Sequence, residues 1–171
     1  MTFKHSFPPV VNEQTRVLVL GSLPGEASLA QSQYYAHPQN RFWHLIGDVI
    51  GVPLPEMAYE ARLQALLDHR VGLWDVIAKA KREGSLDSRI RDHATNDLAA
   101  LVRALPNLAV VAFNGGTAAK IGMRALAESR ASLDLIKLPS SSPAYAAVPY
   151  GEKLRAWEAL RRWLPVFCSR H

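Results

Sequence analysis

Residues 15–22 of the chain have the sequence "TRVLVLGS". Its centre, "VLVL", is apolar throughout and is followed directly by Gly-Ser. A short apolar run without polar alternation is typical of a strand that is buried on both faces, as in a parallel sheet. The Gly-Ser pair is typical of a loop. The stretch therefore predicts a central strand whose carboxyl end opens into a loop.

Three later segments repeat this pattern: "VGLWDVI" at 71–77, "LAVVAFNGG" at 108–116 and "LDLIKLPSSSPAY" at 133–145. Segments with apolar residues at helical spacing lie between and around them. Their ranges are 42–50, 57–70, 96–105, 117–128 and 151–164. Thr95 is expected to cap the helix over 96–105. The alternation of strands and helices predicts an α/β layered fold with a largely parallel sheet.

Length and composition limit the classes of protein that fit. The 171 residues are expected to form a single domain, 1–171, and an apolar share of 49% allows a sizeable core. No run approaches the roughly 20 apolar residues of a membrane span, and the N-terminus lacks an apolar signal core, so a cytoplasmic location is expected. The single cysteine, Cys168, excludes an internal disulfide and a cysteine-rich metal site. A net charge of +5 favours a polyanionic partner without requiring one.

The segments that follow the strands are expected to form the site, because ligands bind beyond the carboxyl ends of parallel strands. "GSLPG" (21–25) permits close approach to its backbone but lacks the spacing of a nucleotide-binding loop. "PSSSPAY" (139–145) is either a solvated turn or a loop whose hydroxyls, on Ser140, Ser141 and Ser142, bind phosphate oxygens. Tyr145 at its end is expected to stack or wedge against bases.

A charged connector, "KAKREGSLDSRIRDH" (79–93), follows the second strand. It is either a solvated loop or a surface on which Lys79, Lys81 and Arg82 face a polyanion. His37 and His44 are seven residues apart with no carboxylate to complete a set of ligands, so no metal site is expected.

Five stretches in order carry a resemblance: "GSLPG", "YYAHPQNRFWHLIG" (34–47), "GLWDVI", "FNGG" and "LPSSSPAY". They resemble the motifs of the uracil-DNA glycosylase superfamily, and within it most of all those of the hypoxanthine-DNA (deoxyinosine) glycosylase family. The mismatch-specific uracil glycosylases come second. The resemblance covers about residues 16–164, and "HPQNRFW" is its most specific string.

The resemblance implies a three-layer α/β/α fold with a central four-stranded parallel sheet, its strands at about 17–21, 72–76, 108–113 and 134–138. It also implies that the protein, as a nucleoid-associated monomer, flips a deaminated base out of DNA and hydrolyses its N-glycosidic bond. The product is an abasic site, and neither a cofactor nor a metal is expected.

Candidate site residues follow from these motifs. Tyr35 occupies the position of the aromatic residue that stacks on the base in the related family, and Phe42 and Trp43 are expected to anchor the next helix in the core. Asn40 is the candidate catalytic residue, because a neutral amide can position water without losing a proton. Its alternative role is to cap that helix.

Asn114 follows a predicted strand, so its amide is expected to donate to O6 and accept from N1–H of hypoxanthine, a pair that adenine reverses. Its alternative role is that of an Asn-Gly turn. Asp75 is a further candidate for contact with base or water, and Gly21, Ser22 and Leu23 are expected to line the same pocket.

Leu23 departs from the pattern of the uracil glycosylases, which carry a catalytic Asn or Asp at this position. The departure favours hypoxanthine over uracil as substrate, with xanthine left open. It also leaves open a protein of another class, a non-catalytic module that binds damaged DNA.

Overall fold

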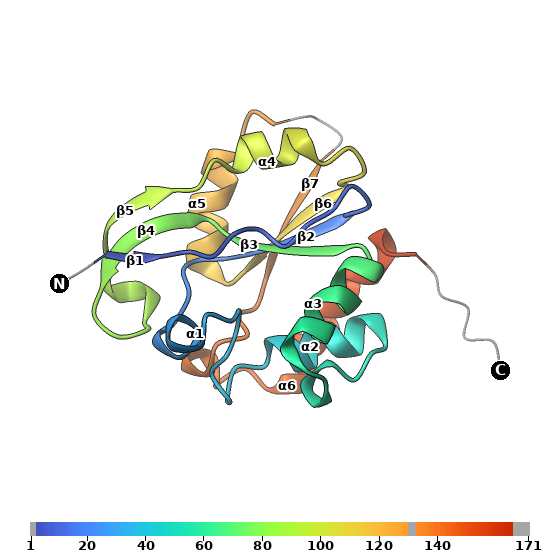
Figure 1. Ribbon diagram of the computed structural model, residues 1–171, viewed down its shortest axis with the longest axis horizontal. Coiled ribbons are helices and arrows are strands. Elements are labelled where there is room, and N and C mark those ends of the chain that lie inside the picture. The colour runs from blue at the N-terminus through green and yellow to red at the C-terminus, as the bar shows by residue number, and fades with distance from the viewer. Residues whose placement is uncertain (1–2, 130–132, 166–171) are drawn as a thin grey trace.

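The structure is a computed structural model that describes residues 3–129 and 133–165. Its centre is a four-stranded sheet of order β3-β2-β6-β7 in which every neighbouring pair is parallel (Figure 1). The strands are β2 (Val17–Gly21), β3 (Val71–Asp75), β6 (Val110–Asn114) and β7 (Asp134–Leu138). The predicted parallel sheet is therefore confirmed, with every strand at the expected place in the chain.

Helices cover both faces of this sheet, which makes three layers (Figure 1). In β2, Val17 and Val19 belong to one apolar cluster and Leu18 and Leu20 to the other, as strand alternation requires. The first cluster contains side chains of α2 (Phe42–Ile50), α3 (Tyr59–Asp68) and α6 (Tyr150–Trp157). The second contains side chains of α4 (Leu98–Ala104) and α5 (Gly116–Ala125).

Shorter elements complete the chain. Helix α1 (Glu26–Gln31) follows β2, and 3₁₀ turns occupy Leu54–Glu56, Asp87–Arg89, Pro143–Tyr145 and Glu158–Trp163. The last of these continues α6, so the helix expected over 151–164 is α-helical only to Trp157. Phe42 and Trp43 are buried, as predicted. In the described part of the chain, no helix combines the length and apolar character needed to cross a membrane.

The charged connector is not a loop. It forms most of a second, antiparallel sheet of order β1-β4-β5, from β1 (Phe3–His5), β4 (Ile77–Arg82) and β5 (Ile90–Thr95). Ile77 and Ala80 are buried while Lys79 is exposed, so apolar side chains that point inward outweigh the charges in setting the structure. Thr95 ends β5, and the cap of α4 is Asp97, whose carboxylate accepts from the Ala100 N–H. The prediction of Thr95 as the cap was wrong.

The parallel sheet brings four distant segments together at one edge. Gly21, Asp75, Asn114 and Leu138 are the last residues of β2, β3, β6 and β7. After β6 the chain turns sharply at Gly115, whose φ of +99° is rarely accessible to other residues. The loops after all four strands therefore converge on the space above this edge.

Candidate active site

A pocket opens at this edge of the sheet and gathers residues from every post-strand segment. Sequence-predicted residues that line it are Gly21, Ser22, Leu23, Tyr35, Asn40, Asp75, Asn114, Ser140, Ser141, Ser142 and Tyr145. Residues that were not expected in the pocket also line it, among them His37, Leu86 and Asp87. The pocket is thus where the strand pattern predicted it, with an additional wall from the 83–89 segment.

Tyr35 is held by stacking and by an uncommon backbone conformation. Its φ is +54°, in the left-handed region that an aromatic residue seldom adopts. This conformation lays its ring on the buried ring of Phe42, with centroids 4.0 Å apart and planes inclined by 17°. The Tyr35 hydroxyl lies 3.4 Å from Nδ2 of Asn114. Burial raises the pKa of that hydroxyl, so the group stays neutral in the pocket.

Asp75 is a buried carboxyl group at the end of β3. Its Oδ2 atom has no hydrogen-bond partner among the described residues, and the residue is 4% exposed. Burial, followed by repulsion from Asp87, raises the pKa of Asp75 to about 7, although Arg82 acts in the opposite direction. A Cβ atom at Gly21 would lie 2.7 Å from Asp75 Oδ1 and 2.8 Å from the Tyr35 hydroxyl. A side chain at position 21 would therefore displace the Asp75 carboxyl group and the Tyr35 hydroxyl from their places beside the end of β2.

The amide of Asn114 is tied to Ser141. Its Oδ1 accepts from the Ser141 N–H at 2.9 Å, and its Nδ2 donates to the Ser141 hydroxyl at 2.8 Å. The second N–H points to the Tyr35 hydroxyl over the longer distance of 3.4 Å. Asn114 is therefore not the free amide that the sequence suggested, and only this weakly engaged N–H is readily available to a ligand.

Asn40 stands just before α2 and makes a contact of the capping type. Its Oδ1 accepts from the Phe42 N–H at 2.9 Å. The next residue, Arg41, donates its N–H to the Ser141 carbonyl at 2.9 Å, which fixes this turn against the serine loop. An amide oxygen has a second lone pair and the amide nitrogen has two N–H groups. Asn40 can therefore support the start of α2 and still bind a water molecule.

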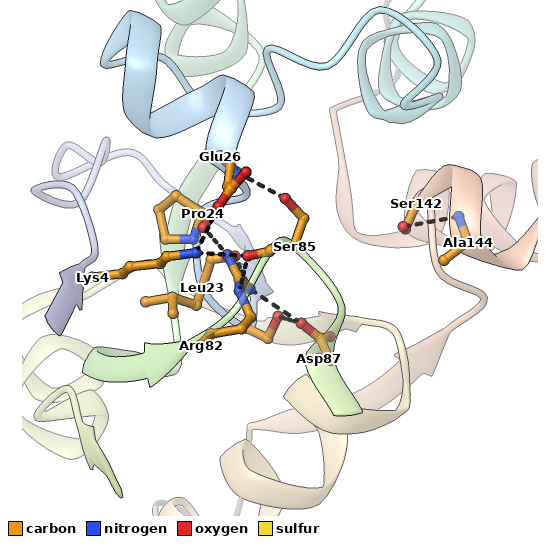
Figure 2. A network of polar contacts seen from close by, with 11 residues as sticks. Lys4, Leu23, Pro24, Glu26, Arg82, Ser85, Asp87, Ser142 and Ala144 are labelled. Carbon is orange, nitrogen blue, oxygen red and sulfur yellow. Dashed lines mark hydrogen bonds and ion pairs between the residues drawn. The ribbon is translucent and has the colours of Figure 1, made fainter. Parts of the chain in front are cut away.

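Arg82 is not on the surface, so the prediction that it faces a polyanion was wrong. It is 1% exposed, and its guanidinium donates to the carbonyls of Leu23, Pro24 and Gly84 (Figure 2). It also lies 3.6 Å from the Asp87 carboxylate, which accepts from the Ser22 hydroxyl at 2.7 Å. A charged side chain is buried here because carbonyl oxygens and a carboxylate surround it.

The other predicted DNA-contacting residues fall into two groups. Lys79 and Lys81 extend over the ring of Phe3, each 5.1 Å from its centroid, and neither lines the pocket. Ser141 is 1% exposed, so its hydroxyl does not face solvent as the phosphate-binding loop required. Ser142 accepts from the Ala144 N–H (Figure 2), and Tyr145 is 49% exposed at the rim of the pocket.

Asp87 is the pocket residue that sequence analysis missed. The connector was interpreted through its lysines and arginines, whereas the acidic residue reaches the pocket. In "AKAKR" (78–82) alanine alternates with lysine, which is typical of a strand, but this pattern does not indicate that Asp87 reaches the edge of the parallel sheet. No group of three or more His, Cys, Asp or Glu residues suited to a metal ion occurs within the described residues.

Known proteins are similar to this chain in sequence and in fold. The family profile of the "Uracil DNA glycosylase superfamily" matches residues 8–162. A "Hypoxanthine DNA glycosylase" of Methanosarcina barkeri is 48% identical over 112 residues, or 66% of this chain and 71% of that protein. One of the same name from Methanosarcina acetivorans is 47% identical over 112 residues, with the same shares of the two chains. The NMR structure of a protein described as a "putative Uracil DNA glycosylase" from Methanosarcina acetivorans superposes with a TM-score of 0.82. It is 40% identical, and the match covers 94% of this chain and 98% of that one.

Proposed function

Since the chain belongs to the uracil DNA glycosylase superfamily, we propose that it excises hypoxanthine from DNA as a monofunctional, cofactor-free glycosylase. The observation that carries this proposal is the pocket itself, where Tyr35, Asn40, Asp75 and Asn114 face one space at the carboxyl edge of the sheet. The two Methanosarcina relatives named hypoxanthine DNA glycosylases support the choice of base.

We infer that Asn114 and Asp75, which both have spare hydrogen-bonding capacity, recognise the base. Hypoxanthine presents an acceptor at O6 and a donor at N1–H, whereas adenine reverses this pair. In this proposal the weakly engaged N–H of Asn114 donates to O6, and Oδ2 of Asp75, when ionised, accepts from N1–H. Adenine would leave both groups without partners, and unpaired buried polar groups discriminate strongly against the wrong ligand. One face of Tyr35 already lies on Phe42, so the base would stack on the other.

Cleavage needs water at C1′ of the flipped nucleotide. The oxygen of that water forms a bond to C1′ while the C1′–N9 bond breaks, its electron pair leaves with the base, and the proton of the water passes to the base or to solvent. Asn40 positions this water through its free lone pair and amide N–H groups, and its neutrality leaves the departing anionic base unopposed. Leu23 has no polar group for this task, so we expect weak uracil excision.

The cellular setting proposed for this activity is the cytoplasm, where the protein would work on DNA as a monomer. A net charge of +5 suits a polyanionic substrate.

The test is an incision assay on a set of duplexes that differ at one position, which holds inosine, uracil, xanthine or adenine. We expect alkali-sensitive abasic sites to form first with inosine and not at all with adenine, in the presence of EDTA. Faster cleavage at uracil would assign the protein to the mismatch type. Tight binding to the inosine duplex without an abasic product would identify a module that only recognises damage.

A further inference from the structure

The pocket is acidic although the chain as a whole is basic. The net charge of the chain is +5, yet the acidic residues Glu26, Asp75 and Asp87 all line the pocket, and among the described residues no lysine or arginine does. The one histidine in this lining, His37, accepts at Nδ1 from the Gln39 N–H, so that nitrogen carries no proton. The described lining therefore presents three carboxyl groups to a ligand and neither an ammonium nor a guanidinium group.

Two of these carboxylates have a cation behind the wall of the pocket (Figure 2). Oε1 of Glu26 lies 3.2 Å from Lys4 Nζ. Oδ1 of Asp87 lies 3.6 Å from the guanidinium of Arg82. Neither Lys4 nor Arg82 lines the pocket. The charges of Glu26 and Asp87 are thus compensated by the protein itself, as partly buried charges usually are.

Asp75 is the exception among the three. It is 4% exposed, and within the described residues its Oδ2 accepts no hydrogen bond and its carboxyl group forms no ion pair. Burial and repulsion from Asp87 raise the pKa of Asp75 to about 7, and the attraction of Arg82 does not offset them. A ligand that brings a positive charge to this carboxyl group would supply the missing partner.

We propose that the pocket also takes cationic purines, such as 7-methylguanine and 7-methylhypoxanthine, and removes them from alkylated DNA. The inference rests on the glycosylase site proposed above and adds a class of substrate that is defined by its charge. Methylation at N7 gives the purine ring a positive charge and leaves O6 and N1–H in place.

The groups assigned to hypoxanthine suit such a base. Asn114 would donate to O6, and Asp75 would accept from N1–H in a hydrogen bond between opposite charges, which is stronger than one between neutral groups. Tyr35 has one ring face on Phe42 and would offer the other to the base. An aromatic face attracts a cation more than a neutral ring.

The charge of the base also changes its departure. The oxygen of water forms a bond to C1′ while the C1′–N9 bond breaks, the electron pair passes to N9, and a proton of the water passes to solvent. A methylated purine cation thus leaves as a neutral base, whereas hypoxanthine leaves as an anion beside Asp75 and Asp87. Unmethylated guanine has the same O6 and N1–H but would also leave as an anion, so it is not expected to be a substrate.

The experiment uses the full-length protein and duplexes in which a single guanine or inosine is methylated at N7 with dimethyl sulfate, beside the unmethylated duplexes. Free base is measured by mass spectrometry, because alkali breaks the strand at 7-methylguanine without any enzyme. Every rate is divided by the spontaneous rate of the same duplex. We expect both methylated bases to be released at least about tenfold faster than spontaneously, a modest lowering of the barrier, and guanine not to be released.

Asp75→Asn tests the charge, because asparagine keeps an oxygen for N1–H and has no negative charge. The ratio of 7-methylhypoxanthine release to hypoxanthine release should fall about tenfold, since a charge-assisted hydrogen bond becomes an ordinary one. Glu83→Gln is the matched control. Glu83 is an exposed carboxylate between β4 and β5 that does not line the pocket, so its loss should leave this ratio unchanged.

The outcomes separate this inference from the proposed function. Release of hypoxanthine without release of either methylated base would overturn the inference and leave the proposed function standing. Release of the methylated bases without hypoxanthine would support the inference and refute the choice of hypoxanthine, and release of none would refute both. A ratio in Asp75→Asn equal to that of wild type would also overturn the inference, because the weaker bond of a methylated purine would then explain its release.

Discussion

At the carboxyl end of β3, Asp75 keeps a carboxyl group in a place where its ionisation is unfavourable. Its pKa is raised from 3.8 to about 7, mainly by burial. The folded state therefore binds this proton more tightly than the unfolded chain does, and ionisation of Asp75 destabilises the fold as pH rises from about 4 to about 7. Such an arrangement is expected for a group retained for binding or chemistry, because stability alone does not favour it.

Asp75→Asn, which imitates the protonated form, should be more stable than wild type above pH 7. The gain should be absent below pH 4, grow between pH 4 and 7 and reach at most about 4 kcal/mol, since each pKa unit corresponds to about 1.4 kcal/mol. Thermal unfolding at pH 4, 6 and 8 measures it. Asp68→Asn, at an exposed carboxylate, is the control and should show no comparable gain. Equal stability of Asp75→Asn and wild type at pH 8 would show that ionisation of the buried Asp75 carboxyl group does not destabilise the fold.

The positions of Asp75 and Asn114 were predictable because each ends a strand of the parallel sheet. Tyr35, Asp75 and Asn114 were expected near one another, and the structure brings them to one pocket. What the sequence could not reveal is how their polar atoms are already used. The contacts of Asn114 with Ser141 depend on the packing of two loops that are distant in the chain, whereas the contact of Asn40 with the Phe42 N–H is local and is one of the two roles expected for Asn40.

Among the elements, the β4–β5 hairpin is the part that sequence analysis interpreted least well. Its positive charges suggested a surface that binds a polyanion. A charged residue type does not show whether the side chain is exposed, however, and Arg82 is buried among carbonyl oxygens. The four parallel strands were predicted because each is a nearly continuous apolar run, a pattern that depends only on local sequence. The β4–β5 hairpin buries Arg82 as well as Ile77 and Ala80, and local sequence does not distinguish a buried arginine from an exposed one, so the place of Arg82 required the tertiary structure.

Removal of the Arg82 guanidinium should loosen this hairpin. Arg82→Met leaves the Leu23, Pro24 and Gly84 carbonyls and the Asp87 carboxylate without their donor, so we expect a loss of about 2–4 kcal/mol in the free energy of unfolding. Denaturant unfolding measures it. Arg89→Met is the control in the same hairpin, since Arg89 is exposed, and should change stability by no more than about 0.5 kcal/mol. Similar losses in the free energy of unfolding for both variants would show that the buried guanidinium stabilises the fold no more than an exposed one.

For the molecule as a whole, a net charge of +5 predicts salt-dependent binding to DNA. If two or more phosphates are neutralised, affinity for undamaged duplex should fall at least about tenfold between 50 and 200 mM salt. The slope of log affinity against log salt concentration reports the number of phosphates contacted. Replacement of both Lys79 and Lys81 by methionine should reduce the magnitude of this slope by roughly 2 if each contacts a phosphate, whereas Arg103→Met on α4 should leave it unchanged. An affinity that does not vary with salt would exclude a phosphate-binding face.

We propose that one pocket hydrolyses the bond to hypoxanthine and that Asn40 is its catalytic residue. The most direct measurement is single-turnover release of free hypoxanthine from an inosine duplex in EDTA, by wild type, Asn40→Ala and Asn40→Asp. Asn40→Asp keeps an acceptor for the Phe42 N–H, so it separates support of α2 from chemistry, and we expect partial activity. Asn40→Ala should lose about 10²–10³ in rate with little change in DNA affinity. Near-normal release of hypoxanthine by Asn40→Ala would contradict the account and reduce Asn40 to a support of the helix.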